Sequence, residues 1–356
     1  MFQAGTLGVP QALAKAARHL RVLVVTNLWP TDADPSYGAA IQAQMKSLGG
    51  LGVDYDVLFV NGRESVVNYI RGIFEVRRRV AAEPYDLIYA HFGLSGWVAR
   101  FQWDVPVVVK FMGDDVLGEF DRHGRITLKG RVFQISSFIL GRLVEGVIVI
   151  SDAMKRRLRL KAAQVVRVGV NLDLFRPMDR MEARRALHLN PAKKYVLFPC
   201  DPKIERKRFD LVQEAVQRAR PEVPEIEILQ VIGVPQERMP LYFNAADVLV
   251  IASECESGPN TVKEAMAVNL PVIAVDVGDV VKTIGDAEGN FIVPRNAVSV
   301  AEKLVHVCRH SIISRGRERL APHSIQGMAE KVVAVFDDVL RRQAGGRHSN
   351  SNKLAI

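Results

Sequence analysis

Short runs of apolar, often β-branched residues alternate with longer amphipathic stretches from Arg21 to about Arg309. The runs have the length of strands, and the longer stretches carry apolar residues at the spacing of helices. Such alternation builds right-handed βαβ units, whose parallel sheets are covered by helices on both faces. The pattern therefore predicts an α/β protein. The expected strands are Arg21–Thr26, Tyr55–Val60, Leu87–His91, Val105–Lys110, Val147–Ile150, Tyr195–Pro199, Ile226–Val231, Val248–Ile251, Val272–Val275 and Asn290–Val293.

The polar segment Asn171–Met178 contains a proline and separates these strands into two series. A chain of 356 residues is also longer than one domain usually is. We therefore predict two Rossmann-like, doubly wound parallel-sheet domains that face each other across a cleft. The expected divisions are an N-terminal extension (residues 1–20), a first domain (21–175), a second domain (176–325), a helix that packs back on the first domain (326–342) and a disordered tail (343–356).

Lysine and arginine outnumber aspartate and glutamate by 48 to 39, which gives a net charge of +9. A basic protein favours polyanionic partners such as nucleic acid, anionic lipid or phosphorylated substrates. The charge gathers at Arg77–Arg79 and at Lys155–Lys161, where a solvated helix face and a binding patch explain it equally well. Basic and aromatic residues are not interleaved, so the pattern does not indicate nucleic-acid binding.

The three cysteines, Cys200, Cys255 and Cys308, lie far apart and form no CxxC pair. This spacing argues against a disulfide framework and against a structural zinc site. No run of 18 or more residues is apolar enough to span a bilayer, and Met1–Leu20 lacks the apolar run of a signal peptide. We therefore expect a cytoplasmic protein that is free or lies on a surface.

One strand-to-helix junction carries the main functional prediction. The segment Glu254–Asn260 follows the expected strand Val248–Ile251 and precedes an expected helix, Thr261–Val268. Ligands of open α/β sheets bind at such junctions, beyond the carboxyl ends of the strands. Gly258 allows close approach of the backbone, and Pro259 suits the first helical position. The amides of Asn260 and Thr261 are then free to bind a diphosphate at the start of the helix.

Two carboxylates flank this anion site. Glu264 lies more than a turn inside the helix and leans back toward its start, where it could accept both hydroxyls of a ribose. Glu256 lies in the loop and could reach the hydroxyls of a sugar beyond the diphosphate. The arrangement fits a sugar–diphosphate–nucleoside. The alternative is that Glu264 pairs locally and Glu256 is a solvated loop residue.

The segment Ser253–Val272 closely resembles the E-x7-E region of the GT-B fold, retaining glycosyltransferases of family 4, the glycosyltransferase group 1 enzymes. Further similarity covers the rest of the chain from about Arg21 to Arg309. It includes Ala245–Leu249, Ala274–Gly278, Gly169–Pro177, Asp86–Gly93 and Phe111–Val116. The resemblance implies two domains in the GT-B arrangement. It also implies a hexosyltransferase that transfers a sugar from a UDP-, GDP- or ADP-sugar with retention of configuration.

The resemblance also assigns roles to residues of the donor site. It implies that Glu256 contacts the donor sugar and that Lys207 lies on the diphosphate, where a fixed cation stabilises the leaving phosphate. These two are the candidate catalytic residues. Gly38 matches the turn that approaches the donor phosphates. The usual arginine position before the lysine holds Asp201, so Lys203 or Arg206 would supply that charge.

The first domain supplies the predicted acceptor side. Met112 stands where many relatives have a histidine, and its thioether cannot shuttle a proton. Retaining transfer in this family is thought to use the leaving phosphate as the base. His91, Asp114 and Asp115 follow strands at the same edge of the sheet and are candidates for acceptor contacts, although a strand-end histidine can equally be a packed core residue.

The resemblance implies a fold that works without a metal, so we expect no cofactor. Asp32 and Asp34 form a literal DxD, which we interpret as turn chemistry rather than as a metal site.

The family assignment suggests a role in bacterial surface polysaccharide assembly, with a glycan or a polyprenyl-diphosphate-linked acceptor. Such an acceptor would bring the first domain to the anionic inner face of the plasma membrane. Val66–Ala82 and Arg125–Arg142 mix apolar and basic residues as interfacial helices do, although both could simply cover the sheet. Two alternatives remain: a non-catalytic nucleotide-sugar-binding partner of another transferase, and a nucleotide-sugar epimerase of the same fold.

Overall fold

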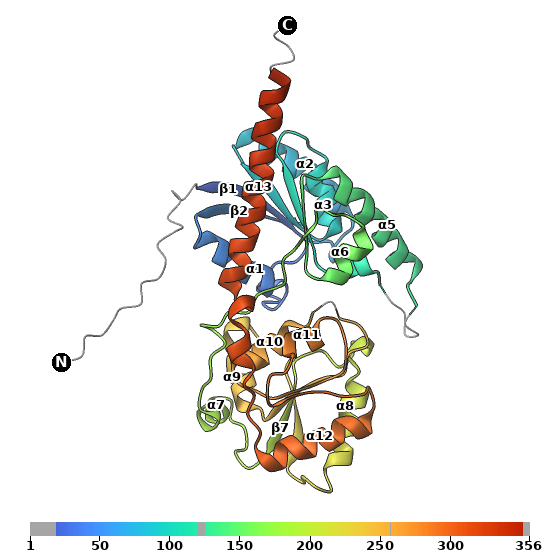
Figure 1. The fold of residues 1–356 in the computed structure, drawn as a ribbon, viewed down its shortest axis with the longest axis vertical. Coiled ribbons are helices and arrows are strands. Elements are labelled where there is room, and N and C mark those ends of the chain that lie inside the picture. Colours follow the sequence, from blue (N-terminus) through green and yellow to red (C-terminus); the bar gives the residue numbers. More distant parts are fainter. Residues whose placement is uncertain (1–18, 120–124, 257, 352–356) are drawn as a thin grey trace, which may run out of the picture.

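The computed structural model describes residues 19–119, 125–256 and 258–351 and shows two α/β domains, one above the other (Figure 1). In the first domain the strands are β1 (Leu20–Thr26), β2 (Val53–Phe59), β3 (Leu87–His91), β4 (Val107–Phe111), β5 (Gly146–Val149) and β6 (Gln164–Val165). They form one parallel sheet in the order β2-β1-β3-β4-β5-β6. The order reverses between β1 and β3, as in a doubly wound fold.

The second domain holds a parallel sheet of five strands in the order β11-β10-β9-β7-β8. Its strands are β7 (Lys194–Phe198), β8 (Ile226–Gln230), β9 (Val248–Ile251), β10 (Val272–Ala274) and β11 (Asn290–Ile292). The prediction of two parallel-sheet domains is confirmed. The sequence-based strands begin or end within about two residues of the observed ones, except that the two-residue edge strand β6 was not expected.

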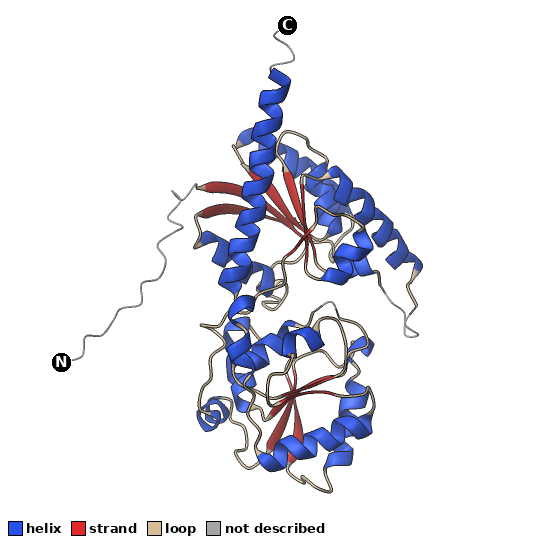
Figure 2. Cartoon of the chain, in the orientation of Figure 1, coloured by secondary structure: helices blue, strands red, loops and turns tan. Residues whose placement is uncertain are grey.

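Helices cover both faces of each sheet (Figure 2). Those of the first domain are α1 (Ala39–Gly49), α2 (Val67–Ala82), α3 (Gly93–Arg100), α4 (Asp114–Leu117), α5 (Leu128–Leu143) and α6 (Asp152–Leu158). Those of the second are α7 (Arg180–Ala186), α8 (Phe209–Ala219), α9 (Met239–Ala245), α10 (Asn260–Ala267), α11 (Val280–Ile284) and α12 (Ala297–His310). Short 3-10 helices include η1 (Glu205–Lys207).

Strand β4 shows how the sequence builds two cores in one domain. All five of its residues are buried. Val107, Val109 and Phe111 pack into the core under α3 and α5, whereas Val108 packs into the core under α1. Side chains alternate between the two faces of a sheet, so a strand whose two faces are both buried is apolar at nearly every position, as observed here. Lys110, on the same face as Val108, is the polar exception and is completely buried.

The last helix, α13 (Ile325–Ser351), returns to the first domain and lies along it (Figure 1). Its buried side chains join the core around α1, and they are Met328, Ala329, Val332, Val335, Phe336 and Val339. The helix continues to Ser351, beyond the end expected at residue 342. The helix therefore extends into the segment that was expected to be a disordered tail from residue 343. Residues 352–356 and 1–18 lie outside the described residues.

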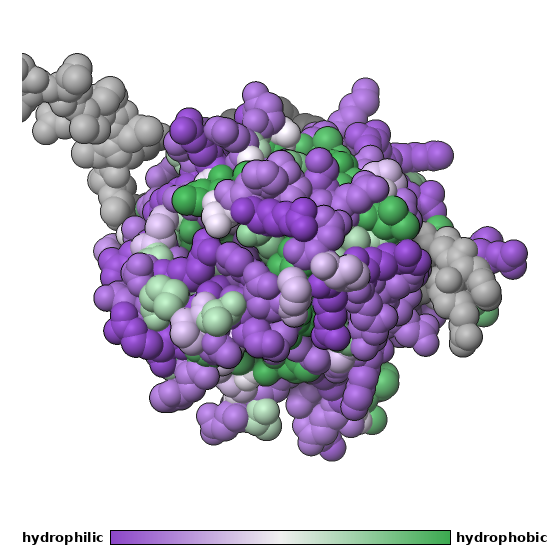
Figure 3. All heavy atoms as spheres, turned by 90° about the horizontal axis from the view of Figure 1, so that it is seen from below, coloured by the Kyte–Doolittle hydropathy of each residue, from purple (hydrophilic) through white to green (hydrophobic). Residues whose placement is uncertain are grey.

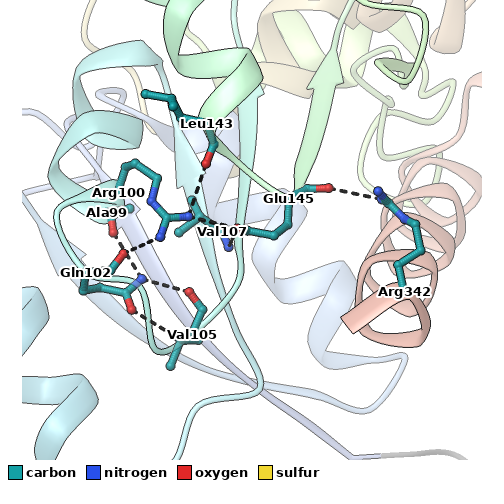
Figure 4. Close-up of polar contacts among 8 residues, drawn as sticks. All are labelled: Ala99, Arg100, Gln102, Val105, Val107, Leu143, Glu145 and Arg342. Carbon is teal, nitrogen blue, oxygen red and sulfur yellow. Dashed lines mark hydrogen bonds and ion pairs between the residues drawn. The ribbon is translucent and has the colours of Figure 1, made fainter. Parts of the chain in front are cut away.

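Arg342 at the far end of α13 donates to the backbone oxygen of Glu145 at 3.1 Å (Figure 4). The Glu145 carboxylate in turn pairs with Arg100, which is 3% exposed and also donates to the carbonyl of Gln102. This cluster joins the end of α3, the turn before β5 and α13. A buried charge is tolerated when it is paired and hydrogen-bonded, as Arg100 is here.

Candidate active site

Helix α10 begins at the junction predicted to bind a diphosphate. Pro259 occupies the N-cap with φ −68° and ψ 116°, one position before the first helical residue expected for it. Its carbonyl accepts the first helical bond, from the amide of Val262 at 3.2 Å. The correction leaves the chemistry intact, because the amides of Asn260 and Thr261 still precede the first intrahelical acceptor. They are available to an anion, with the helix dipole behind them.

Gly258 lies where a side chain could not fit. A Cβ atom built at Gly258 would lie 2.7 Å from Oδ1 of Asp279. Asp279 is 8% exposed, and its Oδ1 has no hydrogen-bond partner among the described residues. The buried Oδ1 of Asn260 also has no hydrogen-bond partner among the described residues. Asp279 approaches α10 from the loop after β10, so no motif spacing identified it as a neighbour of this junction.

Glu264 is partly exposed and faces the first domain. It lines a cavity of about 10 Å³ together with Ala40 and Ala43 of α1 and Gln236. Burial raises the pKa of the Glu264 carboxyl to about 7, against the opposing effects of Lys263 and a hydrogen bond from Gln236. This space holds at most about one water molecule. A ribose therefore needs α1 and α10 to move apart before it can reach Glu264.

Glu256 and Lys207 lie in direct contact. The Lys207 ammonium donates to Oε1 of Glu256, and Arg206 lies 3.7 Å from its other oxygen. The Glu256 side chain is 11% exposed and that of Lys207 is 17% exposed. The amide of Glu254 donates to the Arg206 carbonyl at 2.9 Å, which ties η1 to the loop before α10. The structure thus brings the proposed sugar and phosphate residues together.

Arg206 adds a second cation beside Glu256. It is one of the two residues expected to supply the positive charge that is absent at Asp201. Among the described contacts, the Asp201 carboxylate accepts only the backbone amide of Lys203, at 2.9 Å, and Lys203 is exposed. Arg206 also donates to the carbonyl of Cys255 at 3.1 Å. Of the two candidates for the missing charge, Arg206 is therefore the one that faces the site.

Asp114 and Asp115 have different positions. Asp114 lines a cavity of about 320 Å³ with Arg206 and Cys255, so it faces the second domain. Burial raises its pKa, and Arg206 opposes this shift. Asp115 turns inward and accepts the amides of Gly93, Met112 and Gly113 at 2.9–3.2 Å. Burial raises the pKa of Asp115 to about 6, while these amides act in the opposite direction.

His91 is not brought to the cleft. It is completely buried, and its ring lies 4.4 Å from that of Tyr89. Neither ring nitrogen has a hydrogen-bond partner among the described residues, and burial, followed by the charge of Lys110, lowers its pKa. The packed position is the alternative that the sequence left open for a strand-end histidine.

Gly38 is the N-cap of α1 with φ 80°, a left-handed conformation. A Cβ atom there would lie 2.5 Å from the carbonyl carbon of Leu28, so only glycine closes this turn. The turn opens α1, whose Ala40 and Ala43 face Glu264. Gly38 therefore lies near the second domain, as a donor-approaching turn requires.

Asp34 of the DxD pairs with Arg63 at 3.5 Å and closes a turn with Thr31. Within the described ranges, no group of three or more histidine, cysteine, aspartate or glutamate side chains could hold a metal ion.

Two family models cover most of the chain. Residues 7–171 match the model described as "Glycosyl transferase 4-like domain", and residues 201–310 match "Glycosyl transferases group 1". Two parts of the chain are thus similar to glycosyltransferase domains. They correspond to the first and second α/β domains, and the E-x7-E segment lies in the second.

Among curated relatives, the D-inositol 3-phosphate glycosyltransferase of Mycobacterium marinum is 27% identical over 264 residues, which are 61% of this chain and 54% of the relative. The enzyme of that name from Thermobispora bispora is 25% identical over 329 residues, 77% of this chain and 76% of the relative. The chain thus spans about half the length of the first of these proteins.

Among solved structures, sucrose-phosphate synthase from Thermosynechococcus elongatus superposes with a TM-score of 0.66 at 18% identity, over 95% of this chain and 100% of that one. Anabaena Alr3699/HepE in complex with UDP and glucose gives 0.67 at 12% identity, over 90% and 100%. These likenesses confirm the GT-B fold.

Proposed function

We propose that the protein is a retaining hexosyltransferase that moves a sugar from a nucleotide-diphosphate sugar to a glycan or lipid-linked acceptor in bacterial surface polysaccharide assembly. The observation that carries the proposal is the Lys207–Glu256 pair beside the free amides of α10, with Glu264 farther along the same helix. This order matches the order of sugar, diphosphate and ribose in a donor. A UDP-sugar is the first donor to test, because the structure of Anabaena Alr3699/HepE was solved with UDP-glucose.

The proposed mechanism follows from where charge develops. The donor diphosphate accepts hydrogen bonds from the amides of Asn260 and Thr261 and attracts the Lys207 ammonium away from Glu256. As the bond between sugar and phosphate breaks, negative charge grows on the phosphate that Lys207 and Arg206 face, and fixed cations stabilise that transition state. Once Lys207 has moved away, Glu256 accepts hydrogen bonds from hydroxyls of the donor sugar. The leaving phosphate takes the acceptor's proton, so no protein base is needed and Met112 is tolerated.

The acceptor would enter from the first domain. A cavity of about 210 Å³ is lined by Phe92, Asp114, Ser136 and Ser137, and it adjoins the cavity that Asp114 shares with Arg206. Asp114 would bind an acceptor hydroxyl, and Asp115 would hold the surrounding backbone in place. The names of the curated relatives make D-inositol 3-phosphate one acceptor to include in a screen.

The test combines binding with turnover. Calorimetry with UDP-, GDP- and ADP-sugars identifies the donor, and release of nucleoside diphosphate with an acceptor panel measures transfer. Glu256→Gln should abolish transfer while nucleotide binding persists, whereas Glu254→Gln, in the same loop, should retain activity. A chelator should leave the rate unchanged if no metal takes part. An inverted anomeric centre in the product would refute retention.

Met112 supports a second candidate, a nucleotide-sugar-binding partner without activity. Its thioether lies where many relatives place a histidine, and its amide is held by Asp115. Donor binding without transfer or donor hydrolysis, in the presence of every acceptor tested, would favour this role. Conversion of the donor sugar without an acceptor would instead indicate an epimerase.

A further inference from the structure

Exposed apolar side chains gather on one face of the first domain. Among the described residues, thirteen of the twenty-one large apolar side chains that are exposed belong to α2 and its N-cap residue Val66, to α3 and α5, and to the loop after α3. These helices lie side by side on the face opposite α1 and α13 (Figure 1). Seen from below, the molecule is mainly hydrophilic, with scattered hydrophobic patches (Figure 3). Clustering of this kind on a monomer marks an interaction surface.

Helix α5 carries the densest part of this surface. We call its exposed apolar side chains the α5 face, and they are Leu128, Val132, Ile135, Phe138, Ile139 and Leu143, with exposures of 38–80%. The inward side of the same helix is occupied by Gln134, Ser137 and Leu140, which are buried against the domain. The α5 face is therefore not needed to cover the sheet.

The charge around the α5 face is strongly positive. Helices α2, α5 and α6 together contain ten lysines and arginines and two acidic residues. Beside α5 lies a groove of about 590 Å³, which we call the α5 groove, with Ile135 and Phe138 on its wall and Arg131, Arg157 and Arg159 around it. No carboxylate of the described residues lies within ion-pair distance of Arg131 or Arg159, and Arg157 donates to Gln134. Within the described part of the chain, the groove thus places arginines that have no carboxylate partner next to apolar side chains.

We propose that the α5 face and the α5 groove dock on an anionic phospholipid bilayer, with lipid phosphates on Arg131, Arg157 and Arg159 and the apolar side chains of α5 in the interface. An amphipathic helix with a basic flank binds such a surface through both effects. A protein partner would explain the apolar side chains but not the three arginines around the groove, for which the described residues supply no carboxylate.

This docking extends the proposed function, because α5 also borders the acceptor cavities. Phe133, Ser136 and Ser137 of the same helix line the cavity of about 210 Å³. Lys129 and Phe133 line the neighbouring one, which reaches Arg206. A bilayer on the outer side of α5 would present a lipid-linked acceptor one helix-width from the donor site.

The test is co-flotation of the full chain with vesicles of phosphatidylglycerol and phosphatidylcholine. The protein should float with these vesicles, should not float with phosphatidylcholine alone, and should be released by salt. Arg131→Gln with Arg159→Gln should lower the partition coefficient about thirtyfold, since each cation near the surface contributes roughly a fivefold factor. Ile135→Glu should lower it further.

A matched control changes the other domain: Arg220→Gln with Val298→Glu, both at exposed positions, should float like the parent. Equal losses in the control, or no flotation of the parent, would overturn the proposal. Self-association that Ile135→Glu abolishes, without vesicle binding, would assign the face to a protein contact instead. Thermal unfolding and nucleotide calorimetry of each variant keep failure of docking distinct from failure of the donor site.

Discussion

Replacement of Glu264 by glutamine should stabilise the fold while it weakens donor binding. The folded state holds the Glu264 proton more tightly than the unfolded chain does, because its pKa rises from 4.5 to about 7. Stability is therefore lost as the pH rises from 4.5 through 7. At about 1.4 kcal/mol per pKa unit, the cost of keeping this carboxylate in the folded protein reaches about 3 kcal/mol at pH 8 and only about 1 kcal/mol at pH 5. Solvent reaching the partly exposed side chain makes these figures upper limits.

Urea unfolding of Glu264→Gln and the parent at the two pH values measures the effect. Circular dichroism is the suitable signal, because Trp29, Trp97 and Trp103 all lie in the first domain and report little on α10. The gain in the free energy of unfolding should be larger at pH 8 than at pH 5. Glu214→Gln, on an exposed side chain of α8, is the control and should show no such dependence.

The same variant should bind nucleotide between ten and a hundred times more weakly at pH 8, since hydrogen bonds to a charged group contribute about 1.5–3 kcal/mol. Binding by the parent should strengthen as the pH rises through 7 and Glu264 ionises. A variant that is destabilised equally at both pH values would refute the burial argument. Unchanged nucleotide affinity would refute the assignment of Glu264 to the ribose.

Three further predictions test other parts of the structure. Lys207→Met should lower kcat by about a hundredfold or more, as loss of one transition-state charge contact does, whereas exposed Lys203→Met should have little effect in the same assay. Gly38→Ala should destabilise the protein by more than Gly233→Ala in urea unfolding, because both have positive φ but only Gly38 has backbone within 2.6 Å of the new Cβ. Lys110→Met should raise the free energy of unfolding at pH 7 by up to about 4 kcal/mol, because burial lowers the Lys110 pKa from 10.5 to about 7. The parent should approach the stability of this variant as the pH rises toward 10.5, and an equal difference at both pH values would contradict the reasoning.

The sequence predicted the parts of the fold that depend on local patterns. Strands such as Leu87–His91 and Val248–Ile251 have the observed bounds, because each is an apolar run buried on both faces. The helix start at Asn260 was one residue off, since a proline fits the N-cap as well as the first helical turn. The two residues of β6 are too few to show any period.

The arrangement of the candidate site follows from the sequence where one segment carries its residues, but not where packing brings residues together from separate loops. Glu256, Gly258 and Glu264 belong to one strand–loop–helix unit, so their arrangement followed from spacing. Asp279 and Gln236 approach this unit from separate loops of the second domain, and no spacing connects them to it. His91 lies beside Tyr89 and Lys110, and these two residues contact α1 and α13, which come from distant parts of the chain.

The acceptor side shows why neighbouring residues of one type take different roles. Asp114 and Asp115 are adjacent, so the turn of α4 that brings one toward the second domain directs the other into the first. Both oxygens of the Asp115 carboxylate accept hydrogen bonds from backbone amides, so this group is not available to a substrate. Asp114 remains partly enclosed beside Arg206. Before a donor binds, the negative charge of Asp114 offsets part of the positive charge that the donor diphosphate would neutralise. Donor binding to Lys207 and Arg206, as proposed, would change the electrostatic field at Asp114 and so link occupancy of the donor site to the ionisation of the residue proposed to hold the acceptor.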